Sequence, residues 1–328
     1  MLKQLTDKEL FKLFDKLAVN YRLLVPGNLA DDTRSLLPWE GQQLSLVGEQ
    51  LQRKPTCHFF PQTDPLLTID SQGTSSLPPD QEKPLALCGL SREDLHGIAF
   101  VDRFFSAEPA DDAYLRKRID ALLIGLTGFA GPNHQLLPLA EGNCDFELIA
   151  DQQKWLAVAY TTTGKDWLAA YSDGSAEHLE LIRQQASKLS TPDTELLQRA
   201  SRLLQADQVP DLFWEEIAAR CICCGGCNFA CPTCTCFCMQ DRQTATGVER
   251  SRVWDSCQLD AFMREASGYN PLGTETLRTR RRIHHKLAAD PQRWGELGCV
   301  LCGRCDRACP TGIGMFSICE EIVQRFEA

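Results

Sequence analysis

Eight of the seventeen cysteines form two runs with identical spacing. In each run the cysteines are separated by two, two and three residues, and a proline follows the last one. The runs are Cys221, Cys224, Cys227 and Cys231 before Pro232, and Cys299, Cys302, Cys305 and Cys309 before Pro310. Thiolates at this spacing let a tight loop wrap three corners of an iron–sulfur cubane, while backbone N–H groups offset its negative charge. The sequence therefore predicts two [4Fe-4S] clusters.

The fourth cysteine of each run is expected to cross to the other cluster, as in ferredoxins with two clusters. Pro232 and Pro310 would end any helix and direct the cysteine before them across. The expected ligand sets are Cys221, Cys224, Cys227 and Cys309 for cluster 1, and Cys299, Cys302, Cys305 and Cys231 for cluster 2.

Structural zinc is the alternative, because pairs of cysteines two residues apart also describe zinc ribbons. The third cysteine of each run and the fourth before a proline match the cubane pattern instead. Cys234, Cys236 and Cys257 are surplus to eight ligands. We interpret them as buried packing residues with weak S–H bonds, and the alternative is that they bind a third cluster or metal, with Cys223 or Cys238 as a further ligand.

A dense basic run lies between the two cysteine runs. Nucleic acid would be the obvious partner, but the formal net charge of -10 repels phosphate backbones. We therefore expect no nucleic-acid partner, and a helix that neutralises the clusters or receives an acidic partner surface. The run comprises Arg278, Arg280, Arg281, Arg282, His284, His285 and Lys286.

The length of 328 residues and the 43% hydrophobic content indicate two domains of an α+β protein. Residues 1–205 are expected to form a mixed α/β domain that ends in a helical linker. The helical pattern itself extends from about Ser175 to Arg220 and connects the two domains. Residues 206–328 are expected to form a helical, ferredoxin-like dicluster electron-transfer domain. Thr6 and Glu9 form a capping-box pattern that predicts a first helix. Short apolar runs predict strands at 21–25, 85–88, 98–101, 122–126 and 155–160.

The expected compartment is the cytoplasm. No stretch reaches about 18 uninterrupted apolar residues, and the first residues lack the apolar segment of a signal peptide. An odd number of cysteines without an export signal argues against a disulfide framework and favours metal binding. We expect no membrane span.

The cysteine-rich part resembles the iron–sulfur A subunit of anaerobic sulfite reductase and the related beta subunit of soluble hydrogenases, or sulfhydrogenases. The residues that carry this resemblance are the segments 231–237, 254–257, 277–286 and 302–310. Weaker similarity lies at 54–62 and 89–102. The sequence departs from the family at Glu93, where relatives have a cysteine, so an N-terminal cluster is not expected; Glu93 is interpreted as a helix-start residue.

The resemblance implies an electron relay between a flavin subunit that takes electrons from a nicotinamide and a catalytic subunit that carries siroheme or nickel–iron. Sulfite reduction is modestly preferred over hydrogen metabolism. No Gly-x-Gly-x-x-Gly fingerprint occurs in the sequence. Substrate chemistry would then take place on a partner, and no catalytic residue is assigned.

Two other classes of function stay open at this point. In the first, the chain itself holds a reductase active site, with protons supplied by His96, His134 or His178; these histidines are scattered along the sequence. In the second, the clusters report oxidants in a regulatory redox sensor, although no DNA-binding element is evident.

Overall fold

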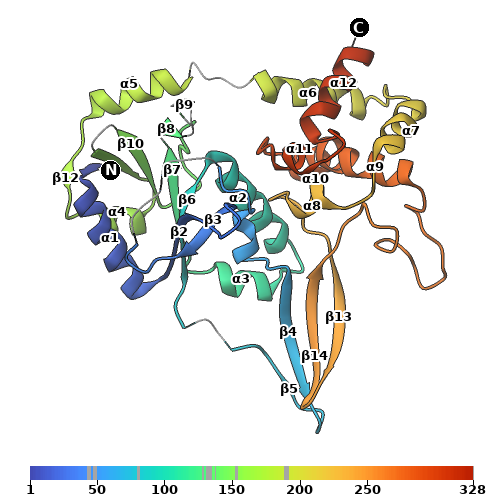
Figure 1. The fold of residues 1–328 in the computed structure, drawn as a ribbon, viewed down its shortest axis with the longest axis horizontal. Coiled ribbons are helices and arrows are strands. Elements are labelled where there is room, and N and C mark those ends of the chain that lie inside the picture. The colour runs from blue at the N-terminus through green and yellow to red at the C-terminus, as the bar shows by residue number, and fades with distance from the viewer. Residues whose placement is uncertain are drawn as a thin grey trace. The chain divides into compact units, whose positions relative to one another are not determined.

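The computed structural model divides the chain into two compact units (Figure 1). Unit 1 comprises Met1–Phe59 and Pro79–Ser190, and unit 2 comprises Phe60–Pro78 and Thr191–Ala328. The structure describes residues 1–42, 46, 50–79, 82–127, 129–130, 135–136, 138–151, 154–187 and 192–327.

Unit 1 is built on an eight-stranded mixed sheet with the order β12-β1-β11-β10-β7-β6-β2-β3. The neighbours β2/β6, β6/β7 and β7/β10 are parallel, and the other pairs are antiparallel. A separate short pair joins β8 (Phe129–Ala130) and β9 (Gln135–Leu136). The strands of the large sheet are β1 (Leu2–Leu5), β2 (Arg22–Asn28), β3 (Arg34–Pro38), β6 (Leu85–Leu90), β7 (Leu122–Thr127), β10 (Phe146–Asp151), β11 (Lys154–Ala159) and β12 (Ser172–Asp173).

Helices cover the sheet of unit 1 because each presents one apolar stripe to it. Helix α1 (Asp7–Asn20) begins with the predicted capping box of Thr6 and Glu9 and buries Leu10 and Leu13 against the sheet. Leu179 of α5 packs with side chains of β10 and β11 in another cluster. The helices are α1, α2 (Arg92–Ser106), α3 (Asp112–Arg118), α4 (Thr162–Leu168), α5 (Ala176–Ser187) and the 3₁₀ turn η1 (Pro55–His58).

One predicted strand of unit 1 is wrong. Residues 98–101 lie inside helix α2, where Ser91 caps the first turn by accepting a hydrogen bond from the Asp94 amide. The short apolar run is one face of a longer amphipathic helix, and a run of four residues does not distinguish the two cases. Glu93 lies in the first turn of α2, as its interpretation as a helix-start residue requires.

Unit 2 contains a helical core that surrounds the cysteine runs. Apolar side chains of α6, α7, α9 and α12 form one buried cluster that includes Leu197, Trp214, Ile283 and Ile318. The helices predicted between Ser175 and Arg220 are α5, α6 and α7. The helices of unit 2 are α6 (Pro192–Gln205), α7 (Asp211–Arg220), α8 (Gly226–Phe229), α9 (Glu275–His284), the π-helical turn η2 (His285–Ala289), α10 (Asp290–Trp294), α11 (Arg304–Ala308) and α12 (Met315–Phe326).

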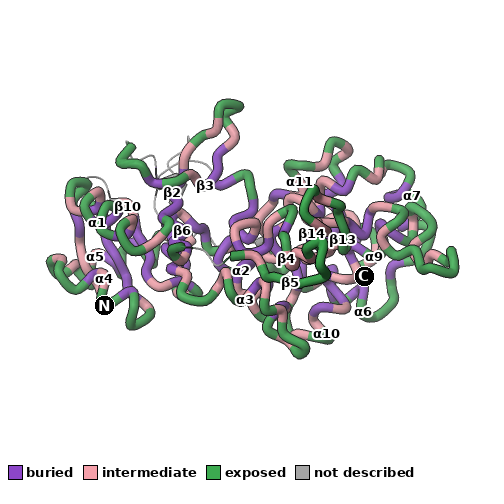
Figure 2. Tube along the Cα trace, turned by 90° about the horizontal axis from the view of Figure 1, so that it is seen from below, coloured by how far each residue is buried: buried purple, intermediate pink, exposed green. Residues whose placement is uncertain are grey.

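Unit 2 also contains an antiparallel sheet that the sequence did not predict. The order is β13-β14-β4-β5 (Figure 1). Strand β4 (Thr63–Asp70) pairs with β14 (Gly247–Trp254), while β5 (Ser75–Ser76) and β13 (Phe237–Thr244) are the edge strands. Much of the sheet is exposed (Figure 2). The ion pair between Arg252 and Asp64 is an exception: its N–O distance is 2.7 Å, and both side chains are at least 98% buried.

The predicted domain boundary between residues 205 and 206 stays a prediction, although α6, before it, packs with α12 in unit 2. In the described part of the chain, every helix is too short or too polar to cross a membrane.

We expect Asp64→Ala to lower the free energy of unfolding by about 3–5 kcal/mol, because it leaves the Arg252 guanidinium buried without its carboxylate partner. Urea unfolding followed by circular dichroism measures this loss. Asp241→Ala is the matched control, since Asp241 pairs with Arg250 at the exposed surface of the same sheet. Equal losses of unfolding free energy in the two variants would contradict the stabilising role of the buried ion pair.

Candidate iron–sulfur site

The two cysteine runs adopt the same backbone conformation. The residue before the second cysteine is left-handed in both, with φ of 53° at Cys223 and 57° at Leu301. The residue after the second cysteine is a left-handed glycine, with φ of 73° at Gly225 and 69° at Gly303. Alternating left- and right-handed residues turn successive N–H groups to one side and form an anion-binding nest. The runs therefore fold as two copies of one loop.

Each loop continues into a short helix that ends just before the fourth cysteine. Helix α8 ends at Phe229 and α11 ends at Ala308, so Pro232 and Pro310 follow the end of a helix, as predicted. A methyl group at Gly226 would lie 3.8 Å from the carbonyl oxygen of Ala308, the residue that precedes Cys309. The end of the second run therefore lies beside the first run.

Backbone amides donate to several of the cysteine sulfurs. The amides of Cys223, Ile313 and Met315 lie 3.4 Å from the Sγ atoms of Cys221, Cys309 and Cys305, respectively. Such N–H groups stabilise negative charge on cluster sulfur and are one of the factors that set a cluster's reduction potential.

A threonine hydroxyl lies beside the fourth cysteine of each run. Thr233 Oγ1 is 3.2 Å from Cys231 Sγ, and Thr311 Oγ1 is 3.4 Å from Cys309 Sγ. The sequence analysis did not identify these threonines. The signal was present, because Cys-Pro-Thr occurs at the end of both runs.

Cysteines from both runs line one cavity of about 320 Å³ in unit 2. All four cysteines expected to hold cluster 2 are among its lining residues: Cys231, Cys299, Cys302 and Cys305. Cys227 of the first run also lines it. Soft thiolate donors suit an iron–sulfur cluster, so the donor set fits the expected cofactor.

No three histidine, cysteine or acidic side chains of the described residues converge on a point where they would hold a single metal ion. A structural zinc ion needs four ligands around one centre. The thiolates of a cubane bind different iron atoms and can lie further apart.

Two buried cations line the same cavity, Arg282 of α9 and Lys286 of η2. Burial works against the charged form of each, but the nearby cysteines raise the pKa of both groups above the ordinary value. Cys227 and Cys305 act on Arg282, and Cys231 and Cys234 act on Lys286. These two members of the predicted basic run thus face sulfur.

Burial raises the pKa of the Cys227 thiol to about 11 and that of the Cys305 thiol to about 12. Burial likewise raises the pKa of Cys299 well above the ordinary value. Burial therefore favours the neutral thiol over the thiolate in each of these cysteines. Coordination to iron is what would remove their protons.

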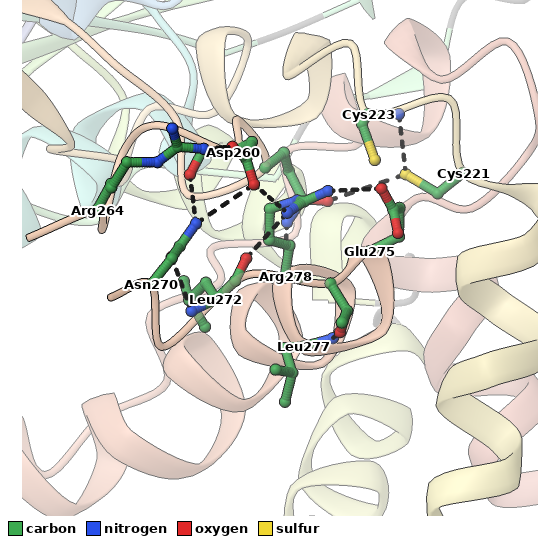
Figure 3. A network of polar contacts seen from close by, with 11 residues as sticks. Cys221, Cys223, Asp260, Arg264, Asn270, Leu272, Glu275, Leu277 and Arg278 are labelled. Atoms are coloured by element: carbon green, nitrogen blue, oxygen red, sulfur yellow. Dashed lines mark hydrogen bonds and ion pairs between the residues drawn. The ribbon is translucent and has the colours of Figure 1, made fainter. Parts of the chain in front are cut away.

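Other members of the basic run are paired with carboxylates. Arg278 is buried and contacts Asp260 at 3.3 Å and Glu275 at 2.8 Å, beside the loop of Cys221 and Cys223 (Figure 3). Gln258 extends this network to the first cysteine run, since its amide donates to the Arg278 carbonyl and its oxygen lies 3.9 Å from Cys221 Sγ. Arg278 therefore anchors the loop that follows Cys257.

The surplus cysteines lie close to the runs. Hydrogen bonds join the side chains of Cys234 and Cys231, and those of Cys236 and Cys257. Cys257 also lies 3.1 Å from the side-chain amide of Asn228. The interpretation of these three cysteines as packing residues, with metal binding as the alternative, stays a prediction, and so does the assignment of the eight ligands.

Two of the three cysteines of unit 1, Cys88 and Cys144, belong to its core, and Cys57 is partly buried. Cys88 on β6 is completely buried, and Cys144 is 5% exposed. Burial raises the pKa of the Cys144 thiol to about 12. Of the histidines considered as proton donors, His96 lies on α2, His178 lies on α5 and His134 lies outside the described residues.

Residues 220–313 match a family model described as a 4Fe-4S dicluster domain. The matched range contains both cysteine runs, so this part of unit 2 is a 4Fe-4S dicluster domain and the chain is an iron–sulfur protein. The whole chain is similar to sulfhydrogenase 2 subunit beta of Pyrococcus furiosus, with 26% identity over 295 residues. The alignment covers 85% of this chain and 86% of that protein, which confirms the family resemblance seen in the sequence. No solved structure matches the chain.

We expect the ligands to cross between the runs, and pairs of substitutions test this directly. Cys302→Ala combined with Cys231→Ala removes two ligands of one cluster and should retain about four iron atoms per chain. Cys302→Ala combined with Cys309→Ala should lose both clusters. Iron, acid-labile sulfide and the reduced-state EPR spectrum measure the outcome.

Cys319→Ala is the control for these pairs, since Cys319 is a buried side chain of α12 outside both runs. The opposite pattern, with Cys302 and Cys309 behaving as ligands of one cluster, would show that each run holds its own cluster.

We also expect Cys88→Ala and Cys144→Ala to leave the iron content unchanged, because both thiols lie in the core of unit 1. Iron and sulfide analysis of the two anaerobically purified variants checks this. A loss of about four iron atoms in either variant would reveal a cluster in unit 1.

Proposed function

We propose that this chain is the electron-transfer subunit of a multisubunit oxidoreductase of the sulfhydrogenase type. The observation that carries the proposal is the pair of cysteine loops with matching backbone conformation, together with the cavity that cysteines of both loops line. Bound clusters would supply one-electron transfer, and two clusters in one unit provide two successive sites for an electron.

The residues of the chain supply the surroundings that such transfer needs. Buried Arg282 and Lys286 bring positive charge to the cysteines, and backbone amides donate to their sulfurs. The first loop reaches the surface, since Cys224 is exposed and Ile222 is 62% exposed. A partner protein can approach the first cluster at this surface while the buried side chains around the site stay in place.

The partners follow from the comparison with a sulfhydrogenase beta subunit. This relative favours a hydrogenase-type complex over the sulfite reductase preferred from the sequence, so the catalytic partner is proposed to be a nickel–iron subunit. A flavin subunit that takes electrons from a nicotinamide is the proposed second partner, because this chain has no Gly-x-Gly-x-x-Gly fingerprint of its own. The cytoplasmic location stays a prediction.

We expect the anaerobically purified chain to contain about eight iron and eight sulfide and no stoichiometric zinc. Purification of the intact complex from its native cells should recover the two partner subunits, and the complex should reduce a viologen dye with hydrogen. A complex that instead oxidises the reduced dye with sulfite would restore the sulfite reductase alternative. Zinc without labile sulfide would exclude the electron-transfer function.

A further inference from the structure

Lys286 contacts residues that flank both cysteine runs of unit 2. Its Nζ atom lies 2.6 Å from Thr233 Oγ1, two residues after Cys231, and 3.1 Å from the carbonyl oxygen of Gly298, the residue before Cys299. The Lys286 carbonyl also accepts a 2.8 Å hydrogen bond from the Gly298 amide. One lysine thus connects the end of the first run to the start of the second.

The local backbone is suited to this connection. Lys286 lies in the π-helical turn η2, a kind of turn that is frequent at functional sites. A Cβ atom at Gly298 would lie 1.8 Å from Oδ2 of Asp290, so a larger residue there would displace the Asp290 side chain. The close approach of Gly298 to this turn therefore fixes the segment that enters the second run.

Lys286 and the Thr233 hydroxyl share one acceptor, the Gly298 carbonyl. Thr233 Oγ1 donates to this carbonyl at 2.6 Å and also lies 3.2 Å from Cys231 Sγ, but the hydroxyl has a single hydrogen to donate. Because the ammonium group of Lys286 can satisfy the Gly298 carbonyl, the hydroxyl can donate to a cluster-bound Cys231 sulfur. A charge-assisted chain then runs from Lys286 through Thr233 to Cys231.

The two cysteine loops differ in what contacts the threonine beside their fourth cysteine. Thr311 lies beside Cys309 as Thr233 lies beside Cys231, but among the described residues no lysine reaches Thr311. Arg282 does not produce the same difference, because Cys227 of one run and Cys305 of the other both act on it. Asp290 is the carboxylate close to Lys286, and burial raises the pKa of Asp290 to about 6.

We propose that Lys286 is a positioning residue for cluster 2, the cluster assigned to Cys299, Cys302, Cys305 and Cys231. Its ammonium group ties Thr233 to Gly298, so that Cys231 and Cys299 face one cluster, and its buried charge raises the reduction potential of that cluster above that of cluster 1. Reduction adds a negative charge, which a buried cation stabilises. This inference rests on the proposed electron-transfer function.

The test is an EPR-monitored redox titration of the full chain, purified anaerobically with its clusters. We expect Lys286→Met to lower the midpoint potential of one cluster and to leave the other unchanged. Arg281→Met is the matched control, since Arg281 carries the same charge on the adjacent helix α9 but is exposed. It should change neither potential.

Two threonine variants show which of the two clusters Lys286 affects. They also test the proposal if the Lys286→Met variant binds less iron. Thr233→Val retains the lysine charge and removes the hydroxyl, so it should produce a smaller downward shift in the cluster that Lys286→Met affects. Thr311→Val should shift only the other cluster. Loss of about four iron atoms from Lys286→Met, with the signal sensitive to Thr311→Val retained, would support the positioning role.

Unchanged potentials in Lys286→Met and Thr233→Val, or equal shifts of both clusters, would overturn the inference. If the wild-type complex transfers electrons but shows no selective shift, this inference alone fails. If the selective shift is measured but the complex does not transfer electrons, the proposed function fails and the role of Lys286 stands.

Discussion

Negative charge on buried sulfur is the constraint that organises unit 2. An ionised group removed from water costs several kcal/mol unless opposite charge or hydrogen-bond donors replace the lost solvation. The two proposed clusters, with their thiolate ligands, would concentrate such charge in one small helical core. Three features of the described residues offset this cost. Left-handed loop residues turn backbone amides toward sulfur, and a threonine lies beside the fourth cysteine of each run. The buried side chains of Arg282 and Lys286 add positive charge.

The insert between the two runs is where much of this compensation originates. Helix α9 and turn η2 place Arg278, Arg282 and Lys286 at intervals of four residues, so the three buried cations follow one face. Arg278 is paired with Asp260 and Glu275 and holds the preceding loop. Arg282 and Lys286 line the cavity of the cysteines. The sequence of the basic run suggests a nucleic-acid surface, but several of its charged side chains are buried in the structure.

The sequence predicts best the structural features that depend on residues close together in the chain. The cysteine runs, the prolines after them and the capping box at Thr6 all depend on residues within one or two turns of chain. The strand expected at 98–101 was wrong because four apolar residues fit a helix face equally well. The sheet of unit 2 could not be read locally, since β4 pairs with β14 across more than 170 residues and β13 is largely polar. The inward face of Arg278, Arg282 and Lys286 could have been predicted from its helical period.

The two cysteine loops have the same backbone conformation, but the residue after the third cysteine makes different contacts in each loop. Asn228 follows Cys227, and its amide donates to Ser256 and Cys257, so it holds the segment after β14. Asp306 follows Cys305, and its carboxylate accepts from the Ser317 amide and hydroxyl at the start of α12. The second loop therefore has a carboxylate where the first has a neutral amide. If each run binds a cluster, as proposed, the two clusters would have different charges around them, and the surrounding charge is one of the factors that set a cluster's reduction potential.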